Sequence, residues 1–165
     1  MLMMMHSAGD IFIRIIADGL VVPIVLLAAF VLLRQPHKVL FERLARGVMV
    51  GLIGLWLAKI FSLLYQEGER PFMILGVTPK AAFLNNPGFP SDHVLFVFCI
   101  TFVVWASTKD RKLGLVFLAL STLVAIGRVL ALVHTPLDVL GGVVCALVAA
   151  TLVYGRNFYR TKLLS

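Results

Sequence analysis

Three ionisable side chains that could do chemistry stand close together in an otherwise apolar stretch, residues 127–138. They are an arginine, a histidine and an aspartate: Arg128, His134 and Asp138. Ionisable groups in membrane-like sequence are costly and usually mark a functional site. Asp138 follows His134 by one helical turn, where a carboxylate can orient the imidazole for nucleophilic attack and should raise its pKa. The alternative is that Asp138 only caps a helix and His134 only forms an interface hydrogen bond.

Pro136 divides this stretch between two predicted helices. Proline lacks an N–H and disfavours a helical conformation in the residue before it, so one helix should end near Val133 and the next should begin at Pro136. Thr135 would then be the N-cap and Asp138 the third helical residue, a pattern that resembles a capping box with Asp in place of Glu. His134 is therefore expected at a mouth between two helix ends.

A second group of polar residues lies upstream and could complete an anion site. Arg70 should close the second apolar span, and Ser91 and His93 should open the third. Ser91 is a good N-cap, so the backbone N–H groups after it would face an anion. Arg70 and Arg128 carry planar, permanently charged groups that suit phosphate oxygens. The sequence thus predicts a phosphate site flanked by two histidines, of which only His134 has a carboxylate one turn away.

The composition places the chain in a membrane. Of its 165 residues, 61% are hydrophobic and 14% are charged, and the mean hydropathy is +1.01; soluble domains have about 25% charged residues. The length allows a single domain, residues 1–165. The net charge of +7 comes from short basic clusters between apolar runs, which indicates membrane topology and not nucleic-acid binding. Cys99 and Cys145 lie in apolar runs, so we expect neither a disulfide nor a metal site there.

Five apolar segments are predicted to cross the bilayer as helices, which makes the fold an all-α integral membrane bundle. The predicted spans are residues 18–33, 47–65, 94–106, 113–133 and 136–154. Residues 11–17 should be interfacial, residues 34–46 a polar connection, and residues 66–91 an extended loop over one membrane face. The first seven residues lack the features of a signal peptide, so the first span should remain in the mature protein.

The basic residues are divided unequally between the two ends of these spans. One side would hold ten of them: Arg34, Lys38, Arg43, Arg46, Lys109, Arg111, Lys112, Arg156, Arg160 and Lys162. The other side would hold four: Arg14, Arg70, Lys80 and Arg128. Because cytoplasmic loops carry the excess of Lys and Arg, the C-terminus is predicted to be cytoplasmic and the active-site loop extracytoplasmic, in the inner (plasma) membrane.

The order and spacing of these residues resemble the three-part signature of the type 2 phosphatidic acid phosphatase superfamily. The matching parts are Arg70-Pro71, Pro90-Ser91-Asp92-His93, and Arg128 followed by His134 and Asp138. Phe89 and the run His-Thr-Pro-Leu-Asp-Val-Leu-Gly-Gly are most similar to the bacitracin-resistance-type undecaprenyl-diphosphatases of that superfamily. The resemblance covers residues 59–142.

This resemblance implies a role for each matched residue. His134 would be the nucleophile that forms a phosphohistidine, Asp138 its partner, and His93 the general acid to the leaving group. The implied phosphate ligands are Arg70, Ser91 and Arg128. The resemblance to undecaprenyl-diphosphatases also implies a role in cell wall biogenesis and bacitracin resistance.

Two positions depart from the superfamily pattern. The pattern has a lysine six residues before Arg-Pro, whereas Lys59 stands with ten residues between it and Arg70. Lys59 would face the phosphate site if α-helical periodicity brings it round, or else extend along the helix to the membrane interface. Gly127 replaces the usual Ser before Arg128, which removes one hydroxyl ligand that a neighbouring N–H could replace.

The leading hypothesis is a phosphatase that hydrolyses undecaprenyl diphosphate to undecaprenyl phosphate without a metal or other cofactor. A metal site is not expected, since no two histidines stand at helical ligand spacing. The alternatives are a phosphatidic acid or phosphatidylglycerophosphate phosphatase, and a lipid-phosphate binding or transport protein without turnover. The expected partners are the polyprenyl or phospholipid phosphate substrate and membrane lipids, and the oligomeric state is left open.

Overall fold

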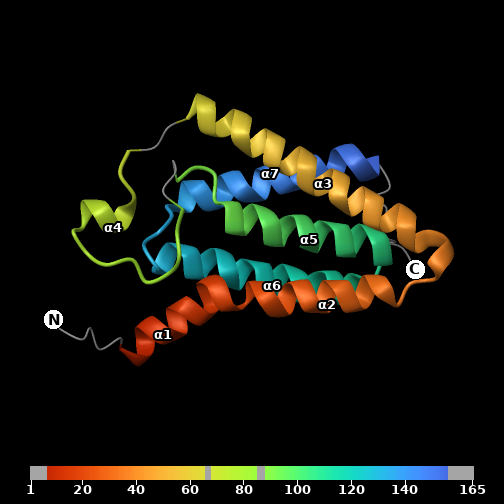
Figure 1. Ribbon diagram of the computed structural model, residues 1–165, viewed down its shortest axis with the longest axis horizontal. Coiled ribbons are helices and arrows are strands. Elements are labelled where there is room, and N and C mark those ends of the chain that lie inside the picture. Colours follow the sequence, from red (N-terminus) through yellow and green to blue (C-terminus); the bar gives the residue numbers. More distant parts are fainter. Residues whose placement is uncertain (1–6, 66–67, 85–87, 156–165) are drawn as a thin grey trace.

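The computed structural model describes residues 7–65, 68–84 and 88–155, which form an elongated bundle of roughly aligned helices (Figure 1). In chain order the elements are α1 (Ala8–Arg14), the π-helical turn η1 (Ile15–Gly19), α2 (Val21–Leu33), α3 (His37–Leu64), α4 (Pro71–Ile74), α5 (Asp92–Thr108), α6 (Arg111–Leu130) and α7 (Pro136–Tyr154). Every regular element in the described residues is helical. The predicted all-α class is therefore confirmed.

Four helical segments are long and apolar enough to cross a membrane, and a fifth is apolar but shorter. The four are Ala8–Leu33, His37–Leu64, Arg111–Leu130 and Pro136–Tyr154, and the shorter one is α5. Large apolar side chains such as Leu52, Leu55 and Trp56 of α3 are exposed on the outside of the bundle. This arrangement is that of a multi-pass membrane bundle, in which the lipid solvates the outer apolar surface.

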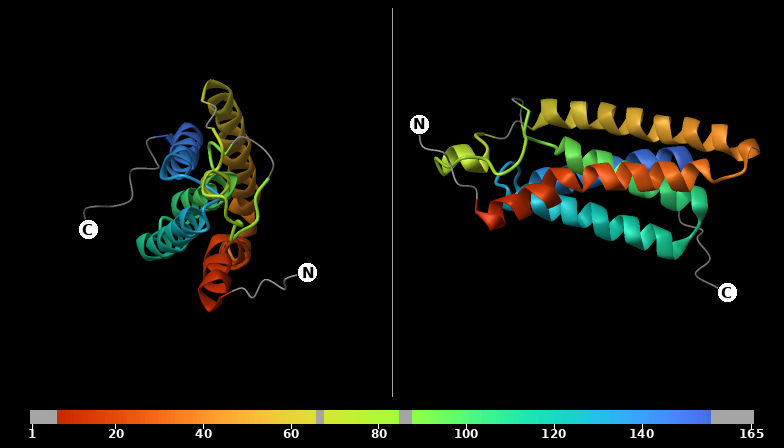
Figure 2. Two further views of the ribbon diagram at one scale, coloured as in Figure 1. Left: turned by 90° about the vertical axis from the view of Figure 1, so that its left-hand side faces the viewer. Right: turned by 60° about the horizontal axis from the view of Figure 1, so that its bottom comes forward.

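The short helix α5 lies at the centre of the bundle, with α2, α3, α6 and α7 packed around it (Figure 2). Ten of its 17 residues are buried, as expected for a helix that is apolar on all sides. The hydroxyl groups of Thr101 in α5 and Ser121 in α6 form a hydrogen bond of 2.7 Å. Such polar contacts hold helices together where lipid is as apolar as the core.

The helical runs at the start of the chain are longer than the predicted spans. The segment 11–17, expected to be interfacial, is part of the helical run Ala8–Leu33, which continues into the predicted first span. The expected polar connection 34–46 is mostly helix, because α3 already begins at His37. Its basic residues are accommodated on the helix surface, where Arg46 pairs with Glu42 one turn earlier at 2.6 Å.

The later boundaries agree more closely with the prediction. α7 spans Pro136–Tyr154 as expected, and α5 begins at Asp92, which lengthens the short third span. α6 ends at Leu130 and not near Val133, because a turn is formed before Pro136. The loop expected at 66–91 contains the short helix α4, and its residues 66, 67 and 85–87 lie outside the described residues.

The site lies at one end of the bundle, at the left in Figure 1, where α5 and α7 begin and α6 ends. The α2–α3 and α5–α6 connections lie at the opposite end, at the right. Seven of the ten basic residues predicted for one side belong to these connections or to the adjoining turns of α3 and α6. The remaining three, Arg156, Arg160 and Lys162, and the segment 1–6 lie outside the described residues.

Two glycines allow close approach of helices at the site end. A Cβ at Gly142 would lie 2.9 Å from the carbonyl oxygen of Ser91, and one at Gly127 would lie 2.8 Å from the backbone nitrogen of Ala17. Glycine is ordinarily unfavourable inside a helix, so packing accounts for both positions. α7 can thereby reach the start of α5, and α6 can contact the backbone of η1.

We expect Gly127→Ala to lower the free energy of unfolding by about 1–3 kcal/mol, because the added methyl group would overlap backbone atoms that cannot move aside alone. The matched control is Gly51→Ala in α3, where no atom lies within 4 Å of the added Cβ. That variant should be neutral or more stable, since alanine is the better helix former. Thermal unfolding in one detergent compares them, and equal midpoints would contradict the close approach at Gly127.

Candidate active site

The turn between α6 and α7 presents the predicted nucleophile. Thr135 caps α7: its hydroxyl accepts a hydrogen bond from the backbone N–H of Asp138 at 3.2 Å, and the Asp138 carboxylate accepts one from the N–H of Thr135 at 2.8 Å. This is the capping box that the sequence predicts. Leu132 has a left-handed conformation with φ 61°, which is unfavourable for a residue with a branched side chain. The turn is therefore held in place by its surroundings.

The segment around α4 supplies much of that support. The N–H of Phe72 donates to the carbonyl of Leu132 at 3.0 Å, and the N–H of Lys80 donates to the carbonyl of Ala131 at 3.3 Å. The guanidinium of Arg70 donates to the carbonyl of Val133 at 2.6 Å. Arg70 does not close the second span as predicted: α3 ends at Leu64, and Arg70 precedes α4.

His134 and Asp138 are brought together as predicted. The His134 Nδ1 lies 3.3 Å from an Asp138 carboxylate oxygen, and the two residues are 5% and 1% exposed. The N–H of Thr135 donates to the Asp138 carboxylate and holds it in place, so the Nδ1–H of neutral His134 is the natural donor to that carboxylate. The Nε2 atom is then left with its lone pair and is the atom that can attack an electrophile.

The predicted direction of the His134 pKa was wrong. Burial of the imidazole lowers its pKa below the usual 6.5, and this outweighs the hydrogen bond to Asp138, which raises it. The charge of the nearby Arg128 lowers the pKa further. Desolvation and a neighbouring cation both disfavour the imidazolium. His134 thus stays neutral, and able to attack, to lower pH than an exposed histidine.

Four of the predicted site residues line one small cavity of about 90 Å³. They are Arg70, His93, Arg128 and His134. Asp92, Gly88 and the segment 82–84 form further parts of the wall. The two arginines can bind an anion in this cavity, and the two histidines can act on it as an acid and a nucleophile.

Asp18 is a site residue that the sequence analysis did not assign. Its carboxylate lies 2.5 Å from a terminal nitrogen of Arg128 and 3.7 Å from His93 Nε2, and it accepts a hydrogen bond from the N–H of Ala82 at 2.8 Å. An aspartate in an apolar helix indicates a functional residue even from sequence alone. Its partner Arg128, however, is 110 positions away, so spacing could not connect them.

Ser91 and Arg128 retain buried polar atoms without protein partners in the described part of the chain. These atoms are the Ser91 hydroxyl and the Arg128 Nε, while the two residues are 0% and 1% exposed. Ser91 is the N-cap of α5, but its side chain makes no capping hydrogen bond. Buried polar groups without partners are uncommon and need an explanation. Arg128 lines the cavity, whereas Ser91 is not part of the cavity lining.

Lys59 is not brought to the cavity. It is exposed on α3, and its backbone carbonyl accepts a hydrogen bond from the Ser62 hydroxyl. The cavity lining does not include it. Lys59 was expected either to face the phosphate site or to extend along the helix to the membrane interface. Its exposed position agrees with the second alternative.

The chain is similar to known proteins over most of its length. Residues 23–162 match the family model described as PAP2 superfamily. The chain is 38% identical over 99 residues to the bacitracin transport permease protein BcrC of Bacillus licheniformis, covering 59% of this chain and 47% of that protein. It is 40% identical over 73 residues to sphingosine-1-phosphate phosphatase 2 of Mus musculus, covering 41% of this chain and 21% of that protein.

The human sphingosine-1-phosphate phosphatase 2 gives a similar match, 41% identical over 73 residues. The chain thus covers about half of the bacterial relative and about a fifth of the mammalian ones. No solved structure matches the chain.

Proposed function

Because the chain belongs to the PAP2 superfamily, we propose that it is a membrane phosphatase that hydrolyses undecaprenyl diphosphate to undecaprenyl phosphate through a phosphohistidine. The observation that carries this proposal is the small cavity lined by Arg70, Arg128, His93 and His134. The likeness to two lipid phosphatases and to a protein named for bacitracin transport supports a lipid phosphate as substrate. The resemblance of Phe89 and the run from His134 to Gly142 to undecaprenyl-diphosphatases favours the polyprenyl diphosphate.

In the first step the terminal phosphate enters the cavity, where Arg70 and Arg128 neutralise its charge. The Ser91 hydroxyl and the free Nε–H of Arg128 donate to its oxygens. His134 Nε2 attacks the phosphorus, and the bond from phosphorus to the bridging oxygen breaks. His93 donates a proton to that oxygen, so undecaprenyl phosphate leaves and the phosphoryl group remains on His134.

In the second step a water molecule attacks the phosphohistidine. His93, now neutral, takes a proton from the water as its oxygen bonds to phosphorus, and the bond to His134 Nε2 breaks. Inorganic phosphate leaves and neutral His134 is restored. Asp138 holds the ring through Nδ1 in both steps, and it stabilises the positive charge that develops on the ring during attack.

We also propose that the cavity opens on the extracytoplasmic face of the inner (plasma) membrane. The unequal distribution of basic residues supports this orientation, and the site lies at the bundle end away from the basic connections (Figure 1). The lipid head would then be bound at the outer interface, while the polyprenyl tail remains among lipids and apolar helix surfaces.

A thiol reagent that does not cross the membrane tests this orientation in intact cells. Cysteine placed at Thr78, an exposed position near α4, should react, and cysteine placed at Lys112, at the start of α6, should not. The native Cys99 and Cys145 are buried and should give little background. Reaction at Lys112 with protection at Thr78 would place the active site in the cytoplasm and contradict the proposal.

A substrate panel tests the activity itself. Purified protein, with and without a metal chelator, is given undecaprenyl diphosphate, phosphatidic acid, phosphatidylglycerophosphate and sphingosine 1-phosphate, and phosphate release is measured. We expect the diphosphate to have the highest kcat/KM, unchanged by chelator. A higher value for a phospholipid monophosphate would favour the alternative phosphatase, and binding without release would favour a lipid-phosphate carrier.

A further inference from the structure

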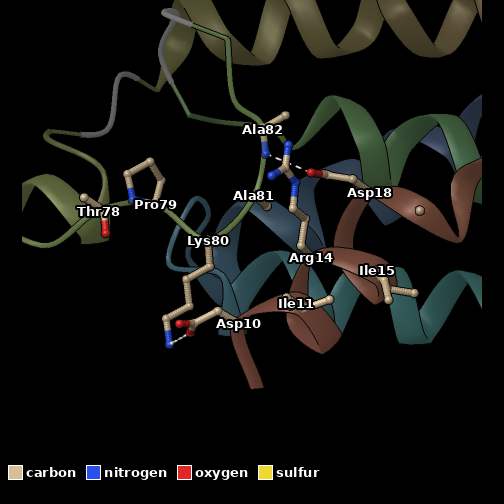
Figure 3. A pocket seen from close by; sticks show the side chains of 11 residues that line it. Asp10, Ile11, Arg14, Ile15, Asp18, Thr78, Pro79, Lys80, Ala81 and Ala82 are labelled. Carbon is tan, nitrogen blue, oxygen red and sulfur yellow. Dashed lines mark hydrogen bonds and ion pairs between the residues drawn. The ribbon is translucent and has the colours of Figure 1, made fainter. Parts of the chain in front are cut away.

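A larger pocket of about 640 Å³ lies beside the catalytic cavity, between the N-terminal helical run and the segment before α5 (Figure 3). Its lining includes Asp10, Arg14 and Asp18 from one side and Thr78, Lys80 and Ala82 from the other. Its volume is in the range of sites that hold small molecules, about 300–1,000 Å³. The catalytic cavity, at about 90 Å³, is well below that range. The remainder of any lipid phosphate must therefore be bound elsewhere.

The larger pocket and the catalytic cavity are neighbours that share part of their lining. Ala82 lines both of them. Asp18 lines the larger pocket, while its carboxylate binds Arg128 and lies near His93, two residues of the cavity wall. The hydrogen bond from the Ala82 N–H to Asp18 completes this wall (Figure 3). The two spaces therefore adjoin at Asp18 and Ala82, and a group bonded to a phosphate in the cavity has to pass between these residues to enter the larger pocket.

The charges in the pocket single out Arg14. Lys80 is paired with Asp10 at 2.8 Å, and Asp18 is paired with Arg128 at 2.5 Å. Arg14 is exposed and forms no ion pair within the described part of the chain. Its side chain extends towards Ala82 and Asp18, the residues of the shared wall (Figure 3). A permanently charged guanidinium in this position is suited to a second phosphate group.

We propose that this pocket is the subsite for the part of the substrate that follows the transferred phosphate, and that Arg14 binds the inner phosphate of a lipid diphosphate. Ile11 and Ile15, which also line the pocket, are apolar and half-exposed, and they provide an apolar path for the lipid tail. Arg14 thereby sets the preference for a diphosphate over a monophosphate. This inference rests on the proposed phosphatase function.

The test compares kcat/KM for a polyprenyl diphosphate and for the monophosphate with the same tail. In Arg14→Gln the ratio of the two values should fall at least about tenfold, the effect of losing one charge-assisted hydrogen bond to phosphate. Arg14→Lys keeps the charge and should recover much of the ratio. The matched control is Arg111→Gln, which removes an exposed arginine at the opposite end of the bundle and should leave the ratio as in the wild type.

The results separate this inference from the phosphatase proposal. An unchanged ratio in Arg14→Gln, or a wild type that hydrolyses only monophosphates, would overturn the subsite while leaving a phosphatase. A wild type without any turnover would overturn the phosphatase instead. In that case calorimetry with inorganic pyrophosphate and orthophosphate tests the subsite: Arg14→Gln should weaken pyrophosphate binding about tenfold more than orthophosphate binding, and equal effects would refute it.

Discussion

His134→Ala should abolish hydrolysis of the lipid diphosphate, reducing kcat by several orders of magnitude. The physical reason is that Asp138 lies 3.3 Å from the Nδ1 of His134 and leaves its Nε2 free to attack, whereas the carboxylate near His93, that of Asp18, lies 3.7 Å from the Nε2 of that ring. Without His134 the covalent route is lost. Initial rates of phosphate release measure the effect. The control is His37→Ala, which removes an exposed histidine at the start of α3 and should keep wild-type activity.

Because His134 is 5% exposed, folding of the variant needs its own measurement. Thermal unfolding should give a midpoint near that of the wild type, and His134→Gln serves as a second variant that better preserves the volume of the ring. Retention of more than about a tenth of the wild-type kcat in a folded variant is a change of less than about 1.4 kcal/mol in the barrier. That result would remove His134 from the nucleophilic role.

Asp138→Asn should have the second largest effect, a loss of kcat on the order of a hundredfold or more, because the imidazole loses the partner that fixes its tautomer. The acidic limb of the pH profile should also move. His134 must be neutral to attack, and the Asp138 carboxylate raises its pKa against the larger lowering by burial. Without that carboxylate the pKa falls further, so activity should persist to lower pH.

Initial rates between about pH 4 and pH 9, on either side of the usual histidine pKa, measure both effects. The matched control is Asp110→Asn, since Asp110 also caps a helix and accepts a hydrogen bond from the N–H of Leu113 at 3.1 Å, but pairs with no histidine among the described residues. That variant should leave the acidic limb in place. An Asp138→Asn profile with a lower maximum and an unmoved acidic limb would mean that Asp138 orients His134 or caps α7 without affecting the pKa of His134.

The parts of the site that depend on neighbouring residues were predictable from sequence. Thr135, Pro136 and Asp138 are within one turn of each other, so capping and proline chemistry alone determine where α7 begins and which side of the turn carries His134. The pairing of His134 with Asp138 follows from the same helical spacing. Hydropathy likewise predicts the spans, because a bilayer imposes both their length and their apolar composition.

The parts that depend on tertiary packing were not predictable. Asp18 reaches Arg128 only because Gly127 lets α6 lie against the backbone of η1, and no local pattern encodes that approach. The early end of α6 requires a left-handed Leu132, which is held by a hydrogen bond to Phe72 far away in sequence. The pKa of His134 depends on how deeply the fold buries it, so a charge partner read from sequence predicted the wrong direction.

The proposed mechanism requires a covalent phosphoryl group on His134. The most direct measurement is to mix the protein with substrate labelled in its terminal phosphate, quench with alkali, which preserves phosphohistidine, and map the label by mass spectrometry of peptides. We predict label on the peptide that contains His134, lost on acid treatment and absent from His134→Ala. Phosphate release in rapid single turnovers with label on no peptide, or on a peptide without His134, would contradict the claim.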